Sequence, residues 1–144
     1  MNKVNKTLLN KAYRTGNRIL HATYHGEIWT SNAYIAERGK IEPRIYKDQL
    51  DQRDRTDKIG RPELEPIIDN TVGGKEKIVA CVDSVDTSLI TTDEKAYYYN
   101  TDLVNYFIAK YGLNNILLQP QDKTSMLFAM DNDNVVAVLA GRLS

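Results

Sequence analysis

The chain of 144 residues has one cysteine, four prolines and two histidines, and no acidic residue precedes Glu27. A single cysteine excludes an internal disulfide and makes a reducing, cytoplasmic environment the expectation. Cys81 stands in an apolar run, so we expect a buried thiol rather than a nucleophile, which needs an exposed, electropositive site. No apolar stretch is suited to a signal peptide or a membrane span, so the sequence predicts no membrane association.

The formal net charge is zero, because 19 basic residues balance 19 acidic ones. This balance argues against a chain that binds nucleic acid or membrane over its whole surface, but it permits a locally basic face. With 144 residues and 42% hydrophobic content, the chain can form one domain with a core that needs neither disulfide nor metal.

Residue groups suited to metal binding or catalysis are scarce. We expect His21 and His25 to share one face of a strand, but Cys81 is the only other residue of a zinc-ligand type besides the acids. Four acids around predicted turns are more typical of solvated loops than of a magnesium site: Asp83, Asp86, Asp93 and Glu94. Gly73–Lys75 lacks the remaining residues of a phosphate-binding loop, and Asp131–Asn134 lacks those of a calcium loop. The sequence therefore predicts a protein that is not an enzyme and has no metal or cofactor.

The N-terminal segment combines a helical apolar pattern with basic residues. Leu8, Leu9, Ala12 and Tyr13 follow helical spacing, which predicts a helix over residues 5–15 that ends near Gly16. The basic residues lie off this apolar stripe: Lys6, Lys11, Arg14 and Arg18. An outward basic face can bind phosphate, although a solvated helix surface has the same appearance.

Strands and turns dominate the rest of the chain. We expect strands over residues 18–24 and 27–36, then a charged, solvated connection over 37–58 with a short helix near 46–53. Further strands are expected over 77–85 and 88–99, the latter interrupted by a turn at 91–94. A helix from Asn100 to Gly112 and strands over 116–119, 125–130 and 135–139 complete the prediction. Tyr97–Tyr99 and Tyr106 can stack on bases, but strand alternation favours burial of about half of them.

The two predicted helices begin alike. Placing Leu8 on Leu103 also places Asn5 on Asn100 and Asn10 on Asn105. Each helix precedes a strand, a hairpin and another strand. We therefore predict two repeats within one domain, over about residues 1–70 and 75–144.

The C-terminal third resembles the last repeat of bacterial DNA sliding clamps. The resemblance rests on the Asn-led helix at Asn100, on Asn115-Ile116, on the turn at Asp122–Ser125 and on the final strand that closes with Arg142-Leu143. It extends to residues 4–13 as a first channel helix and to Pro62–Ile68 as the end of a first repeat. It implies an α+β, DNA-clamp-like fold of two helix-plus-antiparallel-sheet repeats, with helices toward a channel and sheets outside.

The resemblance also implies a function. Clamps hold double-stranded DNA by charge without reading bases, so Lys6, Lys11, Arg14 and Arg18 are the expected phosphate contacts. A non-enzymatic, sequence-independent DNA-binding or replication-accessory protein is expected, self-associating and encoded by a phage or other mobile element. A ring would need six copies. The alternative is a protein-interaction module that inhibits a host replication or defence enzyme without binding DNA.

One feature departs from the clamp pattern. Ala140 and Gly141 stand where clamps commonly have Pro and Met in the apolar pocket that binds partner peptides. Smaller side chains predict a shallower pocket, so the usual partner-peptide site of clamps is not expected here.

Overall fold

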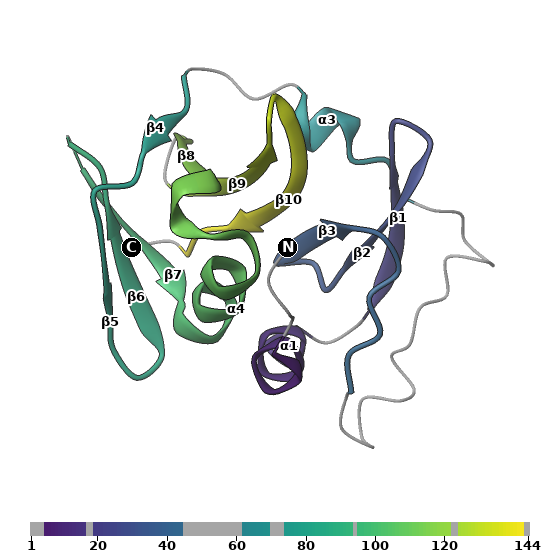
Figure 1. Cartoon of the computed structure of the whole chain (residues 1–144), viewed down its shortest axis with the longest axis horizontal. Coiled ribbons are helices and arrows are strands. Elements are labelled where there is room, and N and C mark those ends of the chain that lie inside the picture. The colour runs from purple at the N-terminus through teal and green to yellow at the C-terminus, as the bar shows by residue number, and fades with distance from the viewer. Residues whose placement is uncertain are drawn as a thin grey trace.

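The computed structural model describes residues 5–16, 19–44, 62–69, 74–93, 95–121 and 124–142. It is a mixed structure of helices and mainly antiparallel strands (Figure 1), so the predicted α+β class is confirmed. Within the described residues, the larger sheet has seven strands in the order β1-β2-β3-β10-β9-β8-β4, and the smaller has three in the order β5-β6-β7.

The first half of the described chain contains α1 (Lys6–Tyr13), β1 (Leu20–Tyr24), β2 (Glu27–Ser31), β3 (Ile35–Arg38) and α3 (Glu65–Ile68). The second half contains β4 (Glu76–Lys77), β5 (Ala80–Asp83), β6 (Thr87–Thr91), β7 (Ala96–Asn100), α4 (Thr101–Tyr111), a 3-10 turn η2 (Leu113–Asn115), β8 (Ile116–Pro120), β9 (Ser125–Asp131) and β10 (Asn134–Ala140).

Both long helices start as the sequence predicts. The Asn5 side chain accepts hydrogen bonds from the N–H groups of Thr7 and Leu8, and Asn100 accepts one from Leu103. These asparagines satisfy amides that lack a partner within the helix. α4 ends at Gly112, whose φ of 83° a residue with a side chain rarely adopts. The predicted helix over 46–53 lies outside the described residues.

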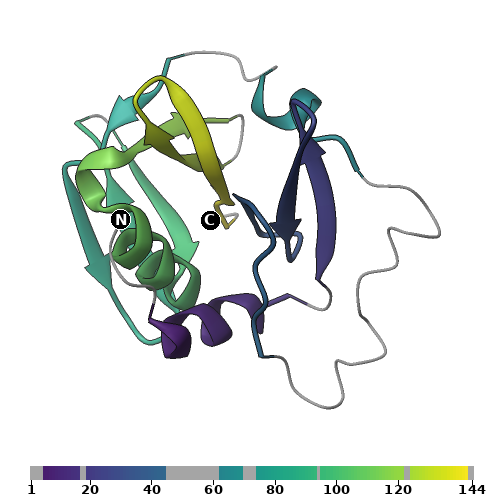
Figure 2. The same ribbon diagram turned by 45° about the vertical axis from the view of Figure 1, so that its right-hand side comes forward.

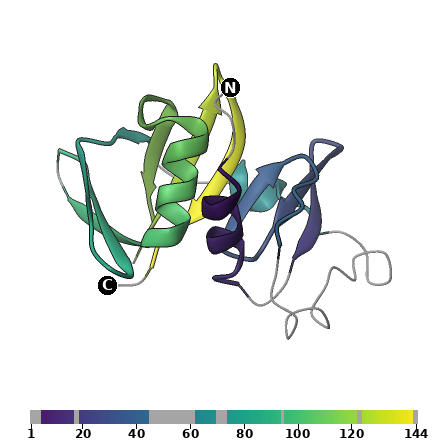
Figure 3. The same cartoon turned by 60° about the horizontal axis from the view of Figure 1, so that its bottom comes forward.

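Each long helix is followed by a three-stranded antiparallel meander. α1 precedes β1-β2-β3, and α4 precedes β8-β9-β10. The last strands of the two meanders pair antiparallel, through Ala137–Glu37, Val138–Ala36 and Leu139–Ile35. α1 and α4 lie side by side (Figure 3). Figure 2 shows the two meanders separated from one another except where β3 meets β10.

Two apolar clusters lie on opposite faces of the larger sheet. The main core lies between this sheet, both long helices and the smaller sheet, and contains Leu127, Ile35 and Leu139. Their chain neighbours Phe128, Ala36 and Val138 belong to the second cluster, with Trp29 and Ile68 of α3. Strand alternation therefore divides the sheet into a helix face and an outer face.

Two strand predictions need correction. The predicted strand over 27–36 is divided into β2 and β3 by a turn, in which Asn32 Oδ1 accepts hydrogen bonds from Tyr34 and Ile35 and Ala33 has a φ of 80°. The predicted strand over 77–85 is likewise divided, because β4 joins the larger sheet and β5 the smaller one. His25 lies in the β1–β2 turn with a φ of 47°, so it does not continue the strand that contains His21.

Candidate functional site

The basic helix face is only partly available. Lys6 and Lys11 are exposed on α1, whereas Arg14 donates from Nε to the Arg44 carbonyl at 3.0 Å. The Asn10 side chain accepts from the Arg44 N–H at 2.7 Å, which brings Arg44 beside α1. Arg18, the fourth predicted phosphate contact, lies outside the described residues. Lys6 and Lys11 are therefore the clearest exposed cations of α1.

α4 contributes little positive charge to this surface. Its exposed Asp102 lies in the first turn, where a carboxylate is favoured by the helix dipole. Lys110 is only 10% exposed and donates to the Glu37 carboxylate at 2.8 Å. This ion pair occupies the one basic residue of α4.

Glu37 is the centre of a buried polar network on the helix face. The sequence prediction placed it in a solvated stretch, which is wrong, because its side chain is 0% exposed. Its carboxylate accepts from Tyr13 of α1 at 2.6 Å and from Tyr106 and Tyr111 of α4 at 2.9 and 2.5 Å. Burial, then the charge of Glu37, raises the pKa of each of these tyrosines. The network satisfies a buried charge and connects both helices to β3.

A hint of the Glu37 network is present in the sequence. Glu37 follows Ile35 at strand spacing, so a buried Ile35 implies that Glu37 faces the same core. Tyr106 belongs to the tyrosines for which burial of about half is favoured over base stacking, and it is buried. No sequence pattern identifies these side chains as partners, because the bonds join positions 24, 69 and 74 residues apart.

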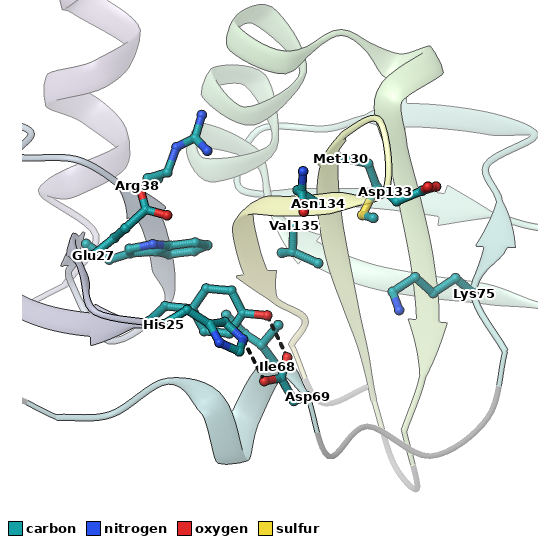
Figure 4. A pocket seen from close by; sticks show the side chains of 12 residues that line it. His25, Glu27, Arg38, Ile68, Asp69, Lys75, Met130, Asp133, Asn134 and Val135 are labelled. Atoms are coloured by element: carbon teal, nitrogen blue, oxygen red, sulfur yellow. Dashed lines mark hydrogen bonds and ion pairs between the residues drawn. The ribbon is translucent and has the colours of Figure 1, made fainter.

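The outer face contains a pocket of about 710 Å³, which Figure 4 shows from close by. Its wall is mainly polar, and four elements each contribute one apolar side chain to it: Trp29 of β2, Ile68 of α3, Met130 of β9 and Val135 of β10. Trp29 is buried, and its Nε1 has no hydrogen-bond partner among the described residues. The charged side chains around the pocket are Glu27, Arg38, Asp69, Lys75 and Asp133.

Asp69 organises one side of this pocket. Its two oxygens contact Tyr24 Oη at 2.5 Å and His25 Nε2 at 3.0 Å. Burial and the hydrogen bond to Asp69 raise the pKa of Tyr24. The His25 amide donates to Glu65 Oε1 at 2.6 Å, which fixes the β1–β2 turn against α3. Both oxygens of Asp69 thus already have partners.

Lys75 lies opposite, with its ammonium 4.9 Å from the centre of the Phe128 ring. Figure 4 shows this ammonium turned toward the interior of the pocket, whereas the Asp133 carboxylate is turned toward the far side of the β9–β10 hairpin. The sequence suggested no such site, because its residues come from separate segments.

The other predicted groups behave as ordinary structure. Cys81 is half-buried against the core, and burial raises the pKa of its thiol to about 11, which disfavours the thiolate. Asp83 accepts from Ser88 Oγ at 2.7 Å, so it is not simply a solvated turn acid. In the described part of the chain, no three His, Cys, Asp or Glu side chains gather closely enough to hold a metal ion. Among the same residues, no helix is long and apolar enough to cross a membrane.

Gly141 stands at a position where a side chain would not fit. A Cβ atom there would lie 2.8 Å from the Ser125 carbonyl oxygen and from Thr124 Oγ1. Glycine is therefore needed where β10 ends against the start of β9. Comparison of the chain with protein-family models, curated proteins and solved structures finds no match.

Proposed function

We propose that this chain is a clamp-like, non-enzymatic accessory domain that contacts the backbone of double-stranded DNA through α1. The observation that carries the proposal is the pair of adjacent helices on one side of the strands, each followed by a meander. A sliding clamp presents a helix pair of this kind to DNA. α1 adds exposed Lys6 and Lys11 and contains no acid. Such a surface binds phosphate without base readout.

The contact with DNA would be one-sided. Lys110 is held by Glu37, and Asp102 would repel phosphate from the start of α4. Two free lysines of one copy supply few phosphate contacts, and each contributes only about 0.9 to the salt slope of binding. Retention on DNA would therefore require several copies acting together.

The free edge of β5 supports self-association. Within the described residues, β5 pairs with β6 alone, and Val79, Val82 and Val85 near it are 59%, 61% and 98% exposed. An edge strand with exposed apolar side chains is prone to pair with another chain. Light scattering on a sizing column, at low and moderate salt, measures the assembly. A mass of about six copies supports a ring, whereas one or two copies excludes it.

The DNA contact is tested by replacing Lys6 and Lys11 together with Glu. Titration of a fluorescein-labelled duplex of mixed sequence, followed by anisotropy, should show that binding at low salt is lost. Where binding persists, the slope of log K against log salt should fall by about two, one for each phosphate contact. The matched control replaces exposed Lys77 and Lys95 with Glu, which changes the net charge equally away from α1. Equal loss in both variants would exclude a specific contact through α1.

The outer pocket favours a second candidate function. A protein-interaction module, such as an inhibitor of a host replication or defence enzyme, needs an apolar recess with a few polar groups rather than a basic face. The pocket near Trp29, Asp69 and Lys75 combines apolar side chains with a larger share of polar ones, and its charges are of both signs. If the unmodified protein fails to bind duplex even at low salt, the interaction module replaces the DNA-binding proposal.

A further inference from the structure

The outer pocket has features that the helix face and DNA contact do not use. It lies on the opposite side of the larger sheet from α1 and α4, so a ligand there and a duplex on α1 would not compete for space. We propose that it binds a short segment of a partner protein in which a bulky apolar side chain is followed by an acidic one. The proposal does not depend on DNA binding.

The size and wall of the pocket fit an apolar side chain. Its volume of about 710 Å³ lies within the range of about 300–1,000 Å³ that is usual for ligand sites. Trp29 and Ile68 line the pocket as buried side chains, whereas the half-buried Met130 and Val135 present apolar surface that a ligand can reach. Burial of an apolar side chain against this surface would favour binding.

The polar groups favour a single carboxylate on the ligand. Lys75 is turned into the pocket, and it has no carboxylate partner in the part of the chain that the structure describes. Asp69 is less available to a cation, because Tyr24 and His25 already bind its oxygens.

The acids around the pocket disfavour nucleic acid. Glu27 and Asp69 line it, so a chain of phosphates would meet repulsion from two carboxylates. One carboxylate directed at Lys75 avoids most of this repulsion. A free inorganic anion has no apolar surface to pack against the apolar side chains of the pocket. A peptide segment therefore fits the pocket better than either alternative.

The only tryptophan of the chain reports on occupancy, because Trp29 lines the pocket. Three capped tetrapeptides would be titrated against the full chain with selective excitation of indole. The first is serine–phenylalanine–aspartate–serine; the second has lysine in place of aspartate, and the third has alanine in place of phenylalanine. We expect a saturable change in emission with the first and at least about tenfold weaker binding of the others, equivalent to 1.4 kcal/mol.

A charge reversal makes the test specific. Lys75→Glu should weaken the aspartate peptide by about tenfold or more and strengthen the lysine peptide. Lys77→Glu, which alters an exposed residue outside the pocket, should leave the order of affinities unchanged. Circular dichroism checks that both variants fold. No response at millimolar peptide, equal responses to all three, or a preference of the unmodified protein for the lysine peptide would each overturn the proposal.

Discussion

The two helix-plus-meander units share an order of elements but differ in how deeply they are buried. α4 buries Thr101, Leu103, Val104, Tyr106 and Phe107, whereas α1 buries only Ala12 and Tyr13. The second meander lies inside the larger sheet, while β1 of the first lies at its end. The second unit therefore provides most of the core, and the first is left with surface that can bind a partner.

Glu37 joins the two units through buried hydrogen bonds to α1 and α4. Removing its carboxylate should cause the largest loss of folding stability. Glu37→Ala leaves the Lys110 ammonium and three tyrosine hydroxyls without their acceptor. Breaking a buried ion pair in this way should reduce the free energy of unfolding by about 3–5 kcal/mol. Urea unfolding followed by circular dichroism measures this loss.

Two further variants sharpen this result. Lys110→Met should cost less than Glu37→Ala, because Glu37 retains three tyrosine donors. Glu42→Ala removes an exposed carboxylate from the same segment and should change stability by less than about 0.5 kcal/mol. If Glu37→Ala and Glu42→Ala cost the same, the network does not hold the two units together.

The second largest effect should be a loss of folding stability at alkaline pH, through the tyrosines that contact Glu37. Tyr13 of α1 and Tyr106 and Tyr111 of α4 have raised pKa values in the folded protein, so unfolding lets them ionise at their ordinary pKa of about 10. Their contribution is thus complete below about pH 10 and is lost above it, by up to about 1.4 kcal/mol per pH unit for each tyrosine. Urea unfolding across this range, with tyrosinate absorbance, measures the loss. Stability that is constant from pH 9 to 11 would contradict the burial of these hydroxyls.

The smallest loss of stability is expected from replacing the residues that cap the two long helices. Asn5→Ala and Asn100→Ala should each cost about 0.5–2 kcal/mol, because each leaves helix amides without an acceptor. We expect the larger loss at Asn100, since its helix contributes more of the core. Hydrogen exchange should show faster opening of α1 alone in Asn5→Ala. Asn114→Ala, at an exposed site, is the control, and faster exchange throughout the chain in Asn5→Ala would contradict a local effect of the cap.

Elements with local signals could be predicted from sequence. α4 has an Asn cap, an apolar stripe and a terminal glycine, and both it and the strands over 116–139 are confirmed close to their predicted bounds. The break between β2 and β3 could not be predicted, because it depends on the side chain of Asn32 and on a left-handed Ala33. A run of strand-forming residues gives no indication of such a turn.

Sites assembled from distant segments were beyond prediction for a different reason. Tyr24 and Asp69 are 45 residues apart, and their contact depends on how α3 packs on the outer face. The basic residues of α1 can be recognised in the sequence, but the sequence does not show which of them remain exposed to bind a phosphate. The binding of Arg14 to the Arg44 carbonyl and the capture of Lys110 by Glu37 follow from tertiary contacts alone.

The junction between β3 and β10 has the form of a contact between two equivalent edge strands. β3 and β10 are the corresponding last strands of their meanders, and they run antiparallel across three residue pairs. Two identical subunits related by a twofold axis make this same arrangement when they join equivalent edge strands. The junction therefore resembles, within one polypeptide, the edge-to-edge strand pairing of a homodimer.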